Sequence, residues 1–161
     1  KRQVRRQDVN LMEIIAAAVE LITPKAKRGS VRILTRCASE LPVIRADQIQ
    51  LEQVFVNLLS NAIEAIESTS QRSGEIKLCA EIKPGQMIEI CVEDNGPGMP
   101  SQVADRLFDP FVTTKPEGMG MGLSITRSIV EAHGGQFWIN TEVSSGVSFH
   151  FTLPISDDSL S

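Results

Sequence analysis

The chain has 161 residues, of which 42% are hydrophobic and 22% charged, a balance that suits one globular domain. Its formal net charge of −4 argues against a nucleic-acid-binding domain, which is usually basic. The single basic cluster, at residues 1–6, is more simply a solvated segment. Three cysteines without a C-x-x-C pair argue against a disulfide framework or zinc site and fit a reducing cytosol. No apolar run approaches the roughly 20 residues that span a bilayer.

Apolar periodicity and turn residues predict the elements in chain order. Helical repeats with capping signals predict three main helices, at about residues 10–29, 47–67 and 122–133. Alternating patterns bounded by turn residues predict strands at about residues 31–36, 75–83, 87–94, 136–141 and 147–153. Between them we expect a short helix at 101–107 and a mobile, Gly-rich loop at 109–121.

This order predicts an α+β domain. Two hairpins imply antiparallel pairs, so the sheet is not the all-parallel, doubly wound kind. We expect a two-layer α/β sandwich, in which three main helices cover one face of a mixed sheet of about five strands. Residues 10–155 would form the domain, residues 1–9 a linker that leads into it, and residues 156–161 a disordered tail.

The second predicted helix carries polar residues beside its apolar face. Asn57, Asn61 and Glu64 fall on one narrow stripe at the helical repeat of about 100° per residue. Their oxygen atoms are the ligands that Mg²⁺ prefers. A polar helix flank with structural hydrogen bonds explains the stripe equally well, so the helix alone does not decide.

The strand at 87–94 ends in a carboxylate followed by a glycine-rich turn. Alternation places Asp94 on the same face as the apolar residues of the strand, where a buried carboxylate needs a hydrogen-bond donor. The exocyclic amine of a purine is such a donor, and Gly96 and Gly98 would let a flat ring approach. An Asp that caps its own turn is the competing interpretation.

Residues 118–123, Gly-Met-Gly-Met-Gly-Leu, directly precede the third predicted helix. Backbone N–H groups at such a helix start attract anions, and Lys115 lies just upstream where it could reach a phosphate. A flexible linker is the alternative. The sequence contains neither a P-loop nor a dinucleotide-binding fingerprint, and it lacks the motifs of Ser/Thr kinases.

The order of these features resembles the GHKL superfamily of ATP-binding domains and, within it, the catalytic domains of sensor histidine kinases. Residues 57–62 look like the N box, 94–99 like the G1 box, 108–115 like the F box and 118–123 like the G2 box. The resemblance covers about residues 10–154. The sequence of the F box is similar to that of the oxygen-sensor and nitrogen-regulation kinases.

The resemblance implies a Bergerat-type ATP-binding fold and a set of residue roles. Mg²⁺ would be held by Asn61 with help from Asn57, and Asp94 would accept a hydrogen bond from adenine. Asn57 and Lys115 would be the catalytic residues. The other residues that contact the nucleotide would be Gly96, Gly98, Met99, Phe108, Thr113, Thr114, Lys115, Gly118, Gly120, Gly122 and Leu123.

One position departs from the family pattern. The last hairpin of these domains often has Gly-Thr, with the threonine supporting the adenine site, whereas this chain has Gly146-Val147. The change would lower the affinity for adenine unless Ser148 compensates.

Two other functions remain open beside the kinase. A GHKL hydrolase needs a glutamate one turn before the metal-binding asparagine, and Asn57, which has no useful basicity, occupies that position. Glu64 is a possible base, but it lies one turn after Asn61. The second alternative is a degenerate nucleotide-binding module without catalysis.

We expect the γ-phosphoryl group of Mg·ATP to pass to a histidine outside this chain. His133 is predicted to cap or pack a helix and His150 to face outward from the last strand, and neither is in a helical acceptor motif. The acceptor would lie on a histidine-containing dimerisation domain of the same protein, with a response regulator further downstream and no nucleic acid as partner. The domain would be cytoplasmic and monomeric alone, within a homodimeric parent kinase that can be membrane-anchored.

Overall fold

The computed structural model describes residues 5–38, 40–68, 73–98, 120–141 and 146–155. Three helices are α1 (Leu11–Arg28), α2 (Gln48–Glu67) and α4 (Gly120–Ala132). The strands are β1 (Gln7–Val9), β2 (Val31–Cys37), β3 (Ile44–Ala46), β4 (Gly74–Lys83), β5 (Met87–Asp94), β6 (Phe137–Asn140) and β7 (Ser148–Pro154).

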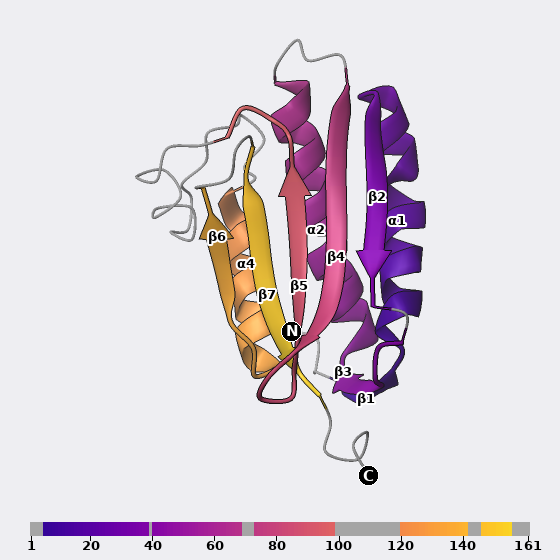
Figure 1. Ribbon diagram of the computed structural model, residues 1–161, viewed down its shortest axis with the longest axis vertical. Coiled ribbons are helices and arrows are strands. Elements are labelled where there is room, and N and C mark those ends of the chain that lie inside the picture. The colour runs from indigo at the N-terminus through magenta and orange to yellow at the C-terminus, as the bar shows by residue number, and fades with distance from the viewer. Residues whose placement is uncertain (1–4, 39, 69–72, 99–119, 142–145, 156–161) are drawn as a thin grey trace.

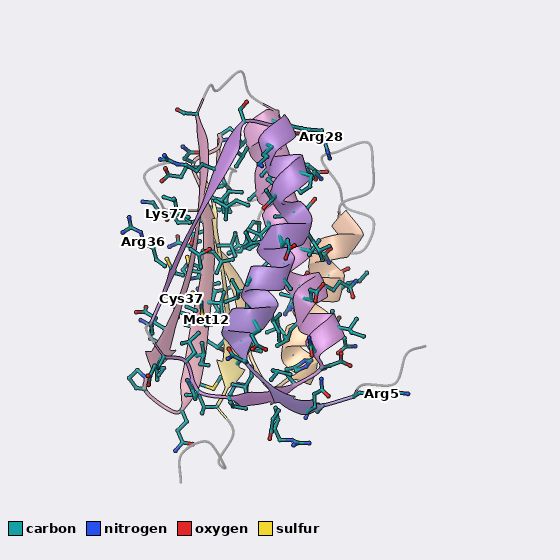
Figure 2. The ribbon with its side chains drawn as sticks, turned by 90° about the vertical axis from the view of Figure 1, so that its right-hand side faces the viewer. Arg5, Met12, Arg28, Arg36, Cys37 and Lys77 are labelled. Carbon is teal, nitrogen blue, oxygen red and sulfur yellow. The ribbon has the colours of Figure 1, made fainter. Side chains whose placement is uncertain are left out.

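Five strands form one mixed sheet in the order β2-β4-β5-β7-β6. The β2–β4 pair is parallel, and the other three pairs are antiparallel. The three helices lie on the same side of this sheet, α1 and α2 behind β2 and β4 and α4 behind β6 and β7 (Figure 1). Figure 2 shows the two layers edge-on, with the opposite face of the sheet bare of helices. The α+β sandwich predicted from the sequence is therefore confirmed.

The core lies between the helical layer and one face of the sheet. The strand β5 alternates between buried and half-buried residues along its whole length, so that Ile88, Ile90, Val92 and Asp94 face the helices. From the other side, α2 contributes a fully buried row that includes Phe55, whose ring centroid lies 5.6 Å from that of Phe151 on β7. The contact ties the longest helix to the centre of the sheet.

Both predicted helix caps are present. The side chain of Asn10 accepts a hydrogen bond from the backbone N–H of Met12 at 3.0 Å, and that of Asp47 accepts one from Gln50 at 3.1 Å. The helix α1 continues through Pro24 without a break.

Several boundaries differ from the predictions. Residues Gln7–Val9, assigned to the linker, form β1 and pair with β3, a strand that the sequence analysis did not predict. The helix α4 begins at Gly120, two residues earlier than expected. The predicted short helix at 101–107, most of the loop at 109–121 and the tail at 156–161 lie outside the described residues. None of the helices in the described part of the chain has the length and hydrophobicity required to cross a bilayer.

Candidate functional site

The central residue of the candidate site is Asp94, at the end of β5. It is 3% exposed, and its backbone N–H donates to the carbonyl oxygen of Val147 at 3.0 Å. One carboxylate oxygen, Oδ1, accepts a hydrogen bond from the backbone N–H of Gly96 at 2.8 Å. The Asx turn considered from the sequence therefore exists, and the carboxylate is buried at the same time. The two interpretations are not exclusive, since a carboxylate oxygen has lone pairs for more than one donor.

Three glycines pack the backbone around the carboxylate, and two of them, Gly96 and Gly146, lie next to it. A β-carbon on Gly146, which has φ +77°, would lie 1.9 Å from the carbonyl oxygen of Asp94, and one on Gly96 would lie 2.9 Å from its Oδ1. A β-carbon on Gly98 would lie 3.2 Å from the carbonyl oxygen of Gly146. The backbone segments 94–98 and 146–147 are therefore packed against each other with no side chain between them. Gly146 was not among the predicted site residues, because the sequence shows it only as half of a turn.

Asn95 fixes the turn from the opposite side. Its side-chain oxygen accepts a hydrogen bond from the backbone N–H of Glu75 at 2.8 Å, and its Nδ2 donates to the carbonyl oxygen of Ser73 at 3.1 Å. Its own backbone N–H donates to the carbonyl oxygen of Glu75 at 3.2 Å. Asn95 thus anchors the turn to the start of β4. The sequence analysis missed this role because the partners are distant along the chain.

The polar stripe of α2 lies beside this turn. A β-carbon on Gly96 would approach the backbone of Ala65 and the side chain of Ile66 to 3.5 Å, so the turn sits against the last turns of α2. Asn61, four residues before Ala65 and thus on the same side of the helix, is 8% exposed. Asn57 is half-buried one turn earlier. The structure therefore brings Asn61 and Asp94 to the same end of the domain.

The side chain of Asn61 is the best test of whether a metal ion fits this site. Its Nδ2 atom is buried and has no hydrogen-bond partner among the described residues. An unsatisfied N–H donor costs free energy, so it is commonly retained where a ligand supplies an acceptor such as a phosphate oxygen. An amide oxygen at this position also matches the oxygen ligands that Mg²⁺ prefers. The side-chain oxygens of Asn61 and Asn57 are thus compatible in type with Mg²⁺.

Glu64, the candidate general base of the hydrolase alternative, is held by another helix. Lys25 of α1 donates to Glu64 Oε1 at 3.0 Å and to the hydroxyl oxygen of Ser60 at 2.6 Å. A carboxylate that already accepts from an ammonium group is poorly suited to remove a proton from water.

The G2 segment is described only in part. Gly120 is the first residue of α4, and Gly122 has open space where a β-carbon would be. Leu123 is 5% exposed and belongs to the hydrophobic core. Six of the predicted nucleotide-site residues lie outside the described residues: Met99, Phe108, Thr113, Thr114, Lys115 and Gly118.

The structure corrects the expectation for Ser148. Its Cα is paired with that of Glu93, and its hydroxyl contacts Cys91 and His150 on the face of the sheet opposite to the helices. Asp94 points to the helical side. The Ser148 hydroxyl therefore cannot replace the threonine that is missing at Val147.

Both histidines are engaged within the fold. His133, 7% exposed at the end of α4, accepts at Nε2 from the backbone N–H of Asp47 at 3.0 Å. Its Nδ1 lies 2.8 Å from the carbonyl oxygen of Ile129 and donates to it. The predicted packing role is confirmed. His150 lies on β7 with its ring on the bare face of the sheet, as expected.

Curated relatives match nearly the whole chain. The sensor protein DctS of Rhodobacter capsulatus, which is involved in C4-dicarboxylate transport, is 38% identical over 98% of this chain and 24% of its own length. The sensor protein FixL of Bradyrhizobium diazoefficiens is 39% identical over 92% of this chain and 29% of its own. The chain thus spans about a quarter of the length of these relatives.

Solved structures agree with the curated relatives. The catalytic domain of the histidine kinase ThkA superposes with a TM-score of 0.83 at 32% identity and covers 96% of this chain and 99% of that domain. ThkA was also solved in complex with the response regulator TrrA, with a TM-score of 0.80 at 30% identity over 98% of this chain and 44% of that one. ShkA, solved in complex with AMPPNP, has a TM-score of 0.84 at 29% identity, and the match covers 96% of this chain and 32% of that one.

A family model agrees with these matches. The model described as "Histidine kinase-, DNA gyrase B-, and HSP90-like ATPase" matches residues 46–157. This span includes α2, the turn after β5, α4 and the last hairpin, which are the elements that build the site described above. The chain therefore belongs to the family of histidine kinase-, DNA gyrase B- and HSP90-like ATPases, and within it to the catalytic domains of histidine kinases.

Proposed function

We propose that this domain binds ATP with Mg²⁺ and passes the γ-phosphoryl group to a histidine on a separate dimerisation domain of a two-component sensor kinase. The observation that carries the proposal is the buried carboxylate of Asp94 among Gly96, Gly98 and Gly146. A carboxylate in such a position accepts strongly from an amino group. The absence of side chains on the glycines lets the backbone segments 94–98 and 146–147 pack closely and hold the carboxylate in place. The complex of ShkA with AMPPNP supports a nucleotide at this site.

The chain's own residues position the nucleotide. Asn61 and Asn57 would hold Mg²⁺, which when bound offsets the negative charge of the phosphate oxygens. Lys115 would add a positive charge beside the triphosphate. Backbone N–H groups at the start of α4, in the segment 118–123, would bind phosphate oxygens. Since the imidazole is itself the nucleophile, phosphoryl transfer requires no general base from this domain.

The acceptor lies outside this chain. The sequence contains two histidines, and each of them has a ring nitrogen held by a hydrogen bond within the fold. His133 is also buried. A histidine-containing dimerisation domain of the same protein is therefore the proposed partner, in a homodimeric parent kinase. A response regulator would receive the phosphoryl group next, a step that the complex of ThkA with TrrA supports.

A hydrolase is the less favoured function because its base is missing. The position one turn before Asn61 holds Asn57, whose amide is not basic. Glu64 is occupied by Lys25.

The decisive experiment is a calorimetric titration of the chain with Mg·ATP, followed for hours by an assay of free phosphate in the same sample. Saturable binding with almost no release of phosphate is expected. Steady release that depends on Glu64, tested with Glu64→Gln, would identify a hydrolase instead. Failure to bind ATP would reduce the domain to a degenerate module.

A further inference from the structure

A row of side chains crosses the bare face of the five-stranded sheet. The strand register places one residue from each strand side by side: Arg36, Cys79, Cys91, His150 and Trp138, on β2, β4, β5, β7 and β6 respectively. Figure 2 shows Arg36 and also Lys77 of β4 on the side of the sheet that faces away from α1 and α2. We call Arg36, Cys79, Cys91, His150 and Trp138 the open-face row. None of them takes part in the nucleotide site, because Asp94 faces the helices.

Two thiols occupy the centre of the open-face row. The Cα atoms of Cys79 and Cys91 are directly opposite each other in an antiparallel pair, where the Cα–Cα distance is about 4.5–5.5 Å. A disulfide needs a Cα–Cα distance of about 4.4–6.8 Å. Both cysteines are half-buried, so small solutes can reach them. The third thiol, Cys37, is opposite Ala80, a residue of the helix-facing side, and contacts the core.

Cys91 also has a path by which it can lose its proton. Its Sγ lies 3.1 Å from the hydroxyl oxygen of Ser148, which in turn lies 2.6 Å from Nε2 of His150. The direct distance from Cys91 Sγ to His150 Nε2 is 3.9 Å. The thiol of Cys91 can therefore donate to Ser148, while the hydroxyl of Ser148 donates to His150.

Burial lowers the pKa of His150, so its imidazole is neutral near pH 7 and Nε2 can accept a proton, while neighbouring groups partly offset the cost of the charge that results. Nδ1 lies 3.8 Å from Oε2 of Glu89, and the negative charges of Glu89 and Glu93 favour the imidazolium. The indole of Trp138 stacks on the ring with a centroid distance of 5.4 Å and an interplanar angle of 6°. A cation above an indole face is attracted by the ring quadrupole.

We propose that Cys79 and Cys91 form a redox-active dithiol that reacts with hydroperoxides, in which Cys91 attacks the oxidant and Cys79 resolves the product. The proton of Cys91 passes through Ser148 to His150. The Cys91 sulfur then forms a bond to the distal oxygen of the hydroperoxide, the O–O bond breaks, and water, or an alcohol from an organic hydroperoxide, leaves. The sulfur of Cys79 attacks the resulting sulfenic acid, an S–S bond forms, the S–O bond breaks, and water leaves. The two thiols are oxidised by two electrons and one hydroperoxide is reduced.

The division of roles follows from the contacts. Burial raises the pKa of both thiols, so neither forms much thiolate unaided. For Cys91 the hydrogen bond with Ser148 partly offsets this effect, although burial still holds the pKa above its usual value. Only Cys91 reaches the Ser148–His150 pair. Cys79 therefore reacts faster with a sulfenic acid held beside it than with an oxidant from solution.

The charges on the same face determine how the reaction depends on pH. The charged side chains that face the two thiols and His150 from neighbouring strands are Arg36, Lys77, Glu81, Glu89 and Glu93. In the native chain, oxidation of Cys91 should slow when His150 becomes protonated at low pH, since it can no longer accept the proton.

The test is oxidation of the reduced chain by hydrogen peroxide, quenched with N-ethylmaleimide and read by intact mass and peptide mapping. We expect a loss of two hydrogen atoms, a disulfide between Cys79 and Cys91, and one thiol, Cys37, that remains free for alkylation.

Cys37→Ser is the matched control and should behave like the native chain. Cys79→Ser should stop at a sulfenic acid on Cys91 that dimedone traps. Cys91→Ser should give neither disulfide nor adduct. If either serine variant has a lower unfolding midpoint than the native chain, the corresponding alanine variant, Cys79→Ala or Cys91→Ala, is used in its place.

The role of His150 has its own readout. His150→Phe should slow the oxidation of Cys91 near neutral pH by on the order of tenfold or more, since general-base transfer commonly contributes at least that much. In this variant the rate of Cys91 oxidation should depend on pH only through ionisation of the thiol. The additional fall at low pH that protonation of His150 causes in the native chain should be missing. The proposal is overturned by a disulfide that includes Cys37, by dimedone labelling of Cys79 before Cys91, by no oxidation under conditions that oxidise free cysteine, or by an unchanged pH profile in His150→Phe.

Discussion

At the scale of single residues, Asp94 has two functions that a substitution can separate. Its Oδ1 accepts from Gly96 and holds the turn, whereas the rest of the carboxylate would accept from the adenine amino group. Asp94→Asn keeps an oxygen for Gly96 but removes the charge and can place an amide N–H group toward adenine. A hydrogen bond to a charged group contributes about 1.5–3 kcal/mol, so we expect the Kd for ATP to rise roughly 10- to 100-fold.

Calorimetric titration of Asp94→Asn with Mg·ATP measures this change. The matched control is Asp8→Asn, which removes an exposed carboxylate that pairs with Arg45 on the β1–β3 ribbon. It should leave the Kd unchanged. Equal affinities of the native chain and Asp94→Asn would show that Asp94 does not contact the nucleotide.

His150 makes a separate prediction about stability and pH. Burial lowers the pKa of His150 below its usual value of 6.5, and Glu89 and Glu93 only partly oppose this effect. The unfolded chain therefore binds a proton at higher pH than the folded chain does. By linkage, the contribution of this group to the free energy of unfolding falls as the pH drops through 6.5 toward the folded pKa.

Urea unfolding at about pH 8 and about pH 5 tests the sign of this effect, since that window spans histidine titration. His150→Gln retains hydrogen-bonding groups but does not titrate. The native chain should lose more stability between the two pH values than the variant. A larger loss in His150→Gln would contradict the lowered pKa.

At the scale of elements, the last hairpin and the end of β5 depend on the absence of a side chain at Gly146. Gly146 and Gly85 both have positive φ, +77° and +86°, but only at Gly146 would a β-carbon collide with backbone, 1.9 Å from the carbonyl oxygen of Asp94. Gly146→Ala should therefore cost about 1–3 kcal/mol more than Gly85→Ala, since both share the penalty of a left-handed conformation. ATP binding should weaken as well, because Asp94 is displaced.

Denaturant unfolding of the two alanine variants checks the comparison. Gly85→Ala serves as the control, because its turn has open space around the β-carbon. Equal losses of stability in the two variants would mean that the two segments separate without cost, and that the close approach is unimportant.

The junction of α2 and α4 depends on one buried imidazole. His133 accepts from the backbone N–H of Asp47 at the start of α2 and donates to Ile129 in α4. His133→Phe leaves the Asp47 N–H group buried without this acceptor, which costs about 1–3 kcal/mol. His133→Gln keeps an acceptor and should lose less. Thermal unfolding of both variants measures the difference, and a phenylalanine variant as stable as the glutamine variant would rule out the hydrogen bond as the cause.

Element length decides how much of the fold could be predicted from the sequence. The helices α1 and α2 and the strands β4 and β5 were found because each has many residues of a clear period. The strands β1 and β3 have three residues each, too few to show alternation. They exist because Val9 pairs with Ile44, far along the chain, and such a pairing has no local signal. The same limit hid the partners of Asn95.

At the scale of the whole molecule, the predicted site is divided between what local motifs reveal and what only packing reveals. The Asp94 turn and the stripe with Asn61 were predicted from their own sequence, and the fold brings them to one end of the domain. Gly146 and the Lys25–Glu64 ion pair were not predicted, since each depends on two segments that meet only in three dimensions. Apolar periodicity shows which side of a helix is buried, but it does not show which residues of other elements contact that side.

The arrangement of the whole domain makes a prediction about the direction of phosphoryl transfer. The described nucleotide-site residues lie on the helical side of the sheet, His150 points from the opposite face, and His133 is buried between α2 and α4. Neither histidine therefore faces a nucleotide at that site. The chain alone should therefore acquire no label from ATP that carries radioactive γ-phosphate. A histidine-bearing dimerisation domain from a sensor kinase that resembles FixL, added to the same mixture, should acquire an acid-labile label.

The double variant His133→Gln and His150→Gln separates the two sources of label. It should phosphorylate the added domain at a rate close to that of the native chain, provided that its unfolding midpoint stays above the assay temperature. The variant Asp94→Asn should label the added domain more slowly, in proportion to its weaker binding of ATP. Stable label on the native chain that disappears in the double variant would mean that the fold opens enough to expose an internal acceptor, and that this domain requires no partner for the transfer.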